Sequence, residues 1–112
     1  MSNDVKNEKQ VFRVDKFKVP AAALAEFAQR AHASHRWLRA LPGFVEDRLL
    51  GSPGEDGRTN VVTVVVWKDA AAFNAAKAAM QKHYREMGYD PGEILKRLGI
   101  EADMAAYIEL AS

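Results

Sequence analysis

The chain has 112 residues, of which 48% are hydrophobic and 28% are charged, a composition typical of one globular domain. Its 16 basic and 15 acidic residues leave a net charge of +1, which creates no field that would favour nucleic acid or an anionic membrane. It contains no cysteine, so disulfides, thiolate catalysis and cysteine-ligated metal sites are excluded.

Residues 1–10, MSNDVKNEKQ, are polar and predict a tail that precedes a single folded domain at residues 11–112. This tail lacks the apolar core of a secretory signal. No apolar run in the chain approaches the roughly 18 residues of a membrane-spanning helix. We therefore expect a cytoplasmic protein that does not bind membranes.

Strand and helix patterns alternate along the rest of the chain. Pro20 ends a first strand and suits the first turn of a helix, and Pro42-Gly43 stops that helix. Asp69 is a plausible N-cap for a second helix, and Gly88 is placed to end it. The expected elements are a strand at 11–19, a helix at 20–41, a strand at 44–50, a loop at 51–58, a strand at 60–67, a helix at 69–88, a short helix at 90–99 and a strand at 104–110.

The third strand is unusual because both of its alternating faces are apolar. One face carries Val61, Thr63, Val65 and Trp67, and the other carries Val62, Val64 and Val66. A strand with one solvated face should alternate apolar and polar residues, so both faces of this strand should be covered.

The order of the elements indicates an α+β, ferredoxin-like βαββαβ fold. In this fold a four-stranded antiparallel sheet carries its helices on one face and leaves the other face bare. Leaving three valines of one strand in water would forfeit about 5 kcal/mol of burial free energy. We therefore predict a homodimer formed through the open face of the sheet.

Two segments carry a family resemblance: LPGF at residues 41–44 and VVTVVVWKDAAAFNAA at residues 61–76. This pairing, with Trp67 ending a strand and Phe73 on the following helix, resembles the antibiotic biosynthesis monooxygenase family of the dimeric α/β barrel superfamily. The resemblance covers about residues 12–110 and implies the same fold and dimerisation. That family contains cofactor-free quinone-forming oxygenases, haem-degrading enzymes and members without an assigned activity.

The two characterised branches of that family resemble this chain to different extents at their functional positions. The quinone-forming enzymes surround an aromatic polyketide with a Trp, which matches Trp67, and with an Asn and a Tyr, which fall at Thr63 and Phe73. The haem-degrading branch has an Asn on the first strand and a Trp and a His on the second helix, and those positions hold Lys16, Ala76 and Glu86. The resemblance therefore does not imply haem degradation.

His35 is the candidate catalytic base. It lies on the apolar stripe of the first helix with Leu24 and Leu38, where a histidine can accept or donate a proton near neutral pH. The alternative is a hydrogen-bonded histidine with a purely structural role. His32 and His35 are spaced to share a metal ion, but no third ligand is apparent, so we expect neither a metal nor a cofactor.

Five further residues are candidates for contact with a small aromatic or apolar ligand: Arg13, Thr63, Trp67, Phe73 and Tyr84. Tyr84 and Trp67 could equally be core residues. Arg13 shares a face of the first strand with Asp15, and the two could form an ion pair or anchor a ligand.

Two aromatic residues are expected outside that site. Trp37 should project from the far side of the first helix and form an exposed contact surface. His83 should be solvated or lie at the edge of the dimer.

Two functional hypotheses follow. The first is a cofactor-independent monooxygenase that acts on a small phenolic substrate in an apolar pocket. The second is a non-catalytic dimer, stress-related or otherwise, that binds a small molecule in the same pocket.

Overall fold

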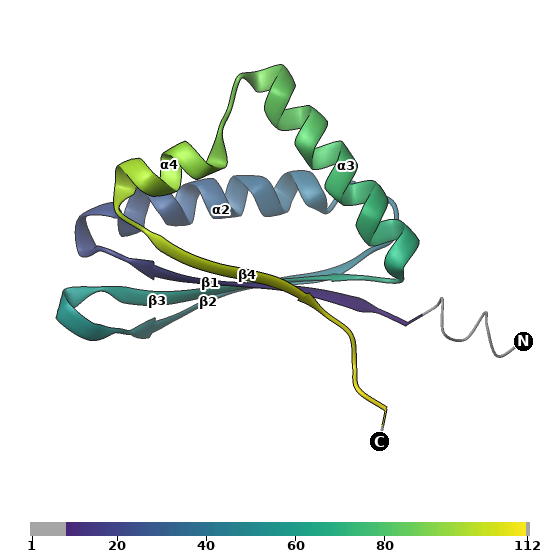
Figure 1. Ribbon diagram of the computed structural model, residues 1–112, viewed down its shortest axis with the longest axis horizontal. Helices are drawn as coiled ribbons and strands as arrows, with labels where there is room; N and C mark the ends of the chain where they lie inside the picture. The colour runs from purple at the N-terminus through teal and green to yellow at the C-terminus, as the bar shows by residue number, and fades with distance from the viewer. Residues whose placement is uncertain (1–8, 112) are drawn as a thin grey trace, which may run out of the picture.

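The sheet of this protein is covered by helices on one face only (Figure 1). The structure is a computed structural model that describes residues 9–111, so most of the predicted tail lies outside the described residues. Four antiparallel strands pair in the order β2-β3-β1-β4. The elements are β1 (Val11–Val19), η1 (Ala21–Ala23), α2 (Leu24–Leu38), β2 (Phe44–Pro53), η2 (Glu55–Gly57), β3 (Thr59–Trp67), α3 (Ala70–Met87), α4 (Pro91–Leu98) and β4 (Glu101–Tyr107). The predicted α+β ferredoxin-like fold is confirmed.

The predicted start and stop residues of α3 and α4 are confirmed. The Asp69 carboxylate accepts a hydrogen bond from the backbone N–H of Ala72 at 2.8 Å, and Gly88 ends α3 with φ of 65°. Asp90 caps α4 through the backbone N–H of Glu93 at 3.3 Å. These capping residues therefore account for both helix boundaries through local backbone hydrogen bonds.

The last strand differs from its prediction. It was expected at residues 104–110, but β4 begins at Glu101 and ends at Tyr107. Tyr107 pairs with Phe12, the second residue of β1, so the residues after Tyr107 have no strand to pair with. Ile108 and Leu110 consequently lie outside the sheet, 54% and 90% exposed.

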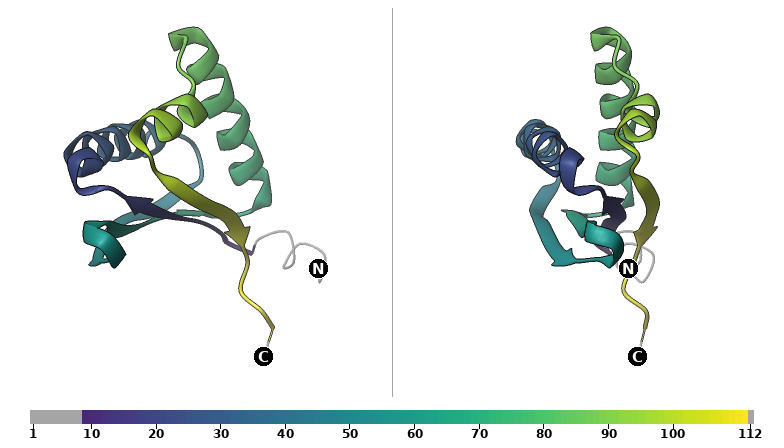
Figure 2. Two further views of the ribbon diagram at one scale, coloured as in Figure 1. Left: turned by 60° about the vertical axis from the view of Figure 1, so that its left-hand side comes forward. Right: turned by 90° about the vertical axis from the view of Figure 1, so that its left-hand side faces the viewer.

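The two apolar faces of β3 have different surroundings in the structure. Thr63 and Val65 are buried on the face that the helices cover. Val62 and Val64 lie on the opposite face, beside Leu50 of β2, which is 52% exposed. No segment among residues 9–111 forms a layer over this outer face, and Figure 2 shows the helices together on the other side.

The predictions of an exposed Trp37 and a solvated His83 are wrong, whereas the alternative position of His83 at the edge of a dimer stays a prediction. The two rings stack on each other, with their centroids 4.4 Å apart and an interplanar angle of 16°, and both residues are half-buried. They join α2 to α3, so neither is a free surface group. The C-terminal end of α3 stands away from the sheet (Figure 2), and Met87 in its last turn is 59% exposed.

Candidate functional site

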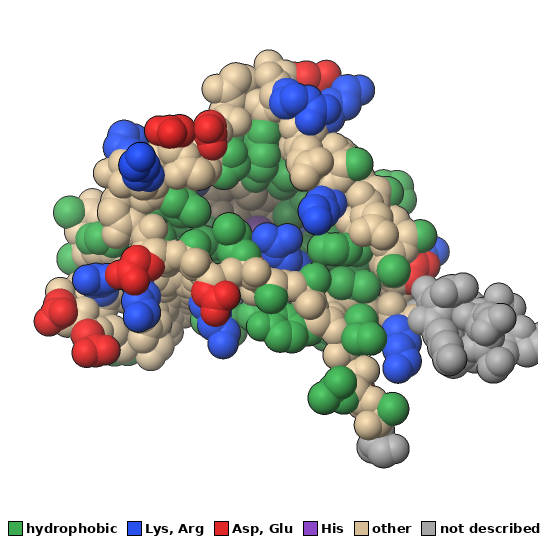
Figure 3. All heavy atoms as spheres, viewed as in Figure 1, with side chains coloured by type: hydrophobic (Ala, Val, Ile, Leu, Met, Phe, Trp, Pro, Cys, Tyr) green, Lys and Arg blue, Asp and Glu red, His purple; other side chains and the backbone are tan. Residues whose placement is uncertain are grey.

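A cavity of about 440 Å³ lies between the sheet and the helices α2, α3 and α4. Figure 3 shows it as a hollow that opens between α3, α4 and β4. Most of its lining is apolar, as is usual for a site that holds a small molecule. The structure brings all six sequence-predicted site residues to this one cavity: Arg13, His35, Thr63, Trp67, Phe73 and Tyr84.

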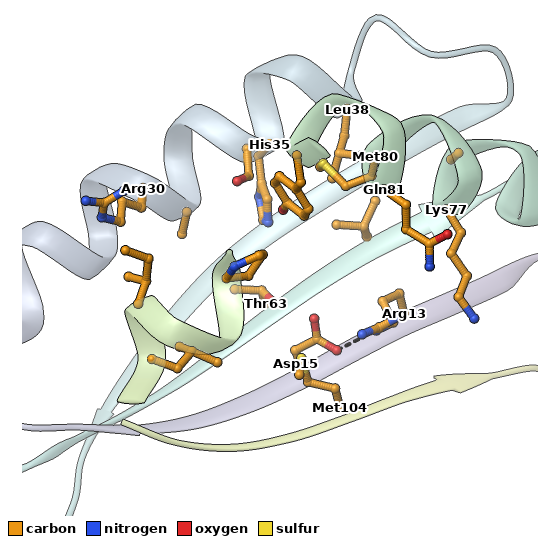
Figure 4. Close-up of a pocket in the computed structure, with 18 of the residues that line it drawn as sticks. Arg13, Asp15, Arg30, His35, Leu38, Thr63, Lys77, Met80, Gln81 and Met104 are labelled. Atoms are coloured by element: carbon orange, nitrogen blue, oxygen red, sulfur yellow. Dashed lines mark hydrogen bonds and ion pairs between the residues drawn. The ribbon is translucent and has the colours of Figure 1, made fainter. Parts of the chain in front are cut away.

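The strand register explains why the candidates on the sheet converge. Arg13 of β1 pairs with Val65 of β3, and Asp15 pairs with Thr63, so these side chains share the inner face of the sheet. Helix α2 crosses the same face and places His35 above Thr63 (Figure 4). The cavity wall therefore includes a polar strip formed by Arg13, Asp15, Thr63 and His35.

His35 is 6% exposed and makes no close hydrogen bond through its ring. Its Nδ1 lies 3.6 Å from Oδ2 of Asp47, which is longer than a hydrogen bond but close enough for electrostatic attraction. Burial lowers the pKa of His35 below its ordinary 6.5, and the Asp47 carboxylate opposes this effect. The imidazole is therefore neutral near pH 7 and can accept a proton.

Asp47 does not line the cavity itself but lies next to His35, and the sequence pattern did not reveal this position. It lies on the inner face of β2 opposite Val65, and Arg39 donates hydrogen bonds to both of its oxygens, at 2.8 Å and 3.1 Å. The hydrogen bonds from Arg39 hold the pKa of Asp47 below its usual range. The sequence signal for this inner position was the two-residue spacing between Asp47 and Leu49, which also faces inward.

Arg13 and Asp15 form an ion pair along a single strand. Nε of Arg13 lies 2.6 Å from Oδ1 of Asp15, and both residues line the cavity. Burial raises the pKa of Asp15, while Arg13 acts in the opposite direction. The pair thus combines the two alternatives left open by the sequence, because it is matched in charge and also faces the cavity.

The aromatic candidates contribute unequally. Trp67 is 3% exposed and meets Phe44 edge to face at 5.9 Å, so most of its ring belongs to the core. Tyr84 packs against Tyr89 with ring centroids 5.1 Å apart, and burial raises the pKa of its hydroxyl. Phe73 lines the cavity from the first turns of α3.

Two further polar residues that sequence reasoning missed, Lys77 and Gln81, also line the cavity. They lie one helical turn apart on α3, and both side chains extend toward Arg13 (Figure 4). Their spacing on the exposed side of an alanine-rich helix resembles an ordinary solvated surface, so the sequence alone did not distinguish them.

Metal and membrane sites were searched over the part of the chain that the structure describes. No cluster of three or more histidine or acidic side chains within residues 9–111 could hold a metal ion. No helix in the same range is both long and apolar enough to cross a membrane.

Solved structures share this architecture. A proposed monooxygenase from Shewanella loihica PV-4 is 23% identical, with 93% of this chain and 97% of that one covered and a TM-score of 0.68. SnoaB, a cofactor-independent oxygenase from Streptomyces nogalater, is 24% identical, with coverage of 93% and 96% and a TM-score of 0.62. A dimeric ferredoxin-like protein from an uncultured marine organism is 11% identical, with coverage of 94% and 99% and a TM-score of 0.71.

The TM-scores and coverages of these structures establish a shared fold. A comparison with curated proteins finds no match. The family comparison is more specific. The sequence model of the family described as antibiotic biosynthesis monooxygenase matches residues 11–87, more than half of the chain. This match includes β1 to β3 and α3, which supply most of the cavity wall. The chain belongs to the antibiotic biosynthesis monooxygenase family.

Proposed function

We propose that this protein is a cofactor-independent monooxygenase that oxidises a small planar phenolic compound in the cavity, with His35 as the base. The observation that carries the proposal is a 6% exposed histidine at the wall of a mainly apolar cavity of about 440 Å³. Burial lowers the pKa of this histidine and so favours its unprotonated form. A base needs to be unprotonated at the working pH and within reach of the substrate. Membership of the family favours oxygenation over other reactions.

The reaction requires no redox group from the protein. His35 removes a proton from the phenolic substrate, and the resulting anion transfers electrons to molecular oxygen. One oxygen atom becomes a new carbonyl of the product, and the other leaves as water with two hydrogens from the substrate. The protein contributes a water-poor cavity, the base and the orientation of the ring.

The remaining candidates are proposed as substrate contacts. Phe73 and the accessible edge of Trp67 provide flat apolar walls for an aromatic ring. The hydroxyls of Thr63 and Tyr84 and the guanidinium of Arg13 provide polar contacts for phenolic or carbonyl oxygens.

Oxygen uptake with a panel of anthrones and hydroquinones tests this proposal. We expect uptake with at least one compound, and a loss of about 100-fold or more in His35→Ala. His32→Ala is the matched control, because His32 lies on the same helix, is exposed and does not line the cavity. Uptake that is equal in His35→Ala and wild type would refute the role of His35. Tight binding of the compounds without any turnover would instead support the non-catalytic small-molecule-binding dimer.

We also propose that two copies assemble through the outer face of the sheet. Leu50 and Tyr107 lie on this face, 52% and 49% exposed, and the apolar Ile108 and Leu110 extend beyond it. Exposed apolar groups gathered on one face are typical of a protein interface. One solved structure of the same fold is described as dimeric. Size-exclusion chromatography with light scattering at micromolar concentration should give the mass of a dimer.

A further inference from the structure

We propose that Asp47 is a positioning residue that orients His35, and that Arg39 in turn holds Asp47 in place. The catalytic consequence rests on the proposed function of His35 as a base, but the positioning itself is a property of the folded chain. Three residues on two elements would then act as one unit beside the cavity.

The distances define this unit. Nε of Arg39 lies 2.8 Å from Oδ2 of Asp47, and the same oxygen lies 3.6 Å from Nδ1 of His35. The side chains of His35 and Asp47 are 7% and 12% exposed, whereas that of Arg39 is 52% exposed. A nearly buried carboxylate thus lies between a buried imidazole and a cation at the surface.

The backbone fixes these residues relative to one another. Arg39 is the C-cap of α2, and its N–H donates a 3.0 Å hydrogen bond to the carbonyl of His35, one turn earlier. Asp47 lies on β2, paired with Val65 in the centre of the sheet. The planar guanidinium binds both carboxylate oxygens, which restricts rotation of the Asp47 side chain.

This arrangement selects one tautomer of the imidazole. With its proton on Nδ1, the ring directs an N–H toward Oδ2 of Asp47 and leaves the lone pair on Nε2 free to accept a substrate proton. The imidazolium that then forms is stabilised by the carboxylate. The 3.6 Å separation between Nδ1 and Oδ2 is short enough for electrostatic attraction between the ring and the carboxylate.

The charged groups around His35 together determine how it titrates. Asp47 on β2 and Asp15 on β1 favour its protonated form, whereas Arg39 and His32 on α2 and burial itself oppose it. Three further cations line the same cavity: Arg13 on β1, which pairs with Asp15, Arg30 on α2 and Lys77 on α3. Tyr84 on α3 is neutral, and the α4 residues at the cavity are uncharged. Removing Asp47, or releasing it by removing Arg39, should therefore weaken the preference of His35 for its Nδ1-protonated tautomer.

NMR titration of the histidine ring protons and nitrogens tests the inference without any substrate. The three histidines are few enough to resolve, and the His35 signals are identified by their loss in His35→Gln. In Asp47→Asn we expect the pKa of His35 to fall by roughly one pH unit, with a loss of the Nδ1-protonated tautomer. In Arg39→Gln we expect a smaller loss of the same tautomer, because Asp47 is no longer held in place.

Glu46→Gln is the matched control. Glu46 neighbours Asp47 in sequence, but its carboxylate lies on the outer side of β2 and pairs with Arg48 at 3.3 Å. An Asp47→Asn spectrum that changes no more than that of Glu46→Gln would overturn the inference. Arg39→Gln keeps the test decisive if Asp47→Asn does not fold, because Arg39 is at the surface. An unchanged population of the Nδ1-protonated tautomer in that variant would also overturn the inference.

Kinetics separate this inference from the proposed function. If the protein oxidises a phenol, Asp47→Asn should move the acid limb of the pH–rate profile to lower pH and reduce the plateau kcat by roughly 10-fold. A protein that shows the expected NMR shifts without turnover would refute the oxygenase and leave the positioning role intact. Turnover that depends on His35, with unchanged NMR titrations in both variants, would refute only the positioning role.

Discussion

Leu50→Asp should dissociate the proposed dimer while leaving the folded monomer nearly intact. Leu50 lies on the outer face of β2, paired with Val62, and is already 52% exposed in a single chain. The monomer therefore loses little burial when this side chain is replaced. In a two-fold dimer, by contrast, the Leu50 side chain of each copy becomes buried at the interface.

The size of the effect follows from that exposed fraction. Full burial of a leucine contributes about 2 to 3 kcal/mol, so the half that remains exposed contributes about 1 kcal/mol per copy on dimerisation. A buried, unpaired carboxylate costs about 1 to 3 kcal/mol more per copy. The two copies together lose at least about 4 kcal/mol, which weakens the dimer by roughly 1,000-fold in Kd.

Analytical ultracentrifugation over a range of concentrations measures this change. Met87→Asp is the matched control, because Met87 is 59% exposed at the far end of α3 and not on the sheet. We expect wild type and Met87→Asp to be dimers at micromolar concentration and Leu50→Asp to be a folded monomer by circular dichroism. A Kd for Leu50→Asp within a few-fold of that of wild type would refute assembly through this face.

Three further predictions concern stability, each measured by urea unfolding. Burial lowers the pKa of His35, so the unfolded chain takes up a proton before the folded chain as the pH falls. The free energy of unfolding should therefore decrease below about pH 6.5 in wild type but not in His35→Gln. An equal decrease in both proteins would contradict this assignment. Asp69→Ala removes the N-cap of α3 and should cost about 1 kcal/mol, whereas a change near zero would mean that the cap is dispensable. Arg13→Gln leaves Asp15 without its counter-ion in the cavity wall and should lower the free energy of unfolding by about 1 to 3 kcal/mol at neutral pH. The decrease should be smaller at acid pH, where Asp15 is protonated. A decrease that does not depend on pH would contradict the ion pair.

The features that could be predicted from the sequence depend on neighbouring residues. Asp69 and Gly88 bound α3 because a cap and a left-handed residue satisfy backbone groups within one turn. The two apolar faces of β3 follow from the two-residue period of a strand. His35 could be placed in the interior because it continues the helical spacing of Leu24 and Leu38.

The features that could not be predicted depend on how distant elements meet. Asp47 reaches His35 only because β2 pairs with β3 in one register and α2 crosses above it. Trp37 meets His83 because α3 packs beside α2, and the periodicity of either helix alone contains no such information. The end of β4 is set by where β1 begins, not by the apolar pattern of its own residues.

Oxygen-isotope incorporation into the product tests the proposed reaction most directly. In labelled oxygen gas, a phenolic substrate oxidised by the wild-type protein should gain one labelled atom in its new carbonyl, with the second labelled atom released as water. His35→Ala should form this product at least about 100-fold more slowly, and His32→Ala should match wild type. A product without label, or labelled product formed equally fast by His35→Ala, would contradict a monooxygenase that uses His35 as its base.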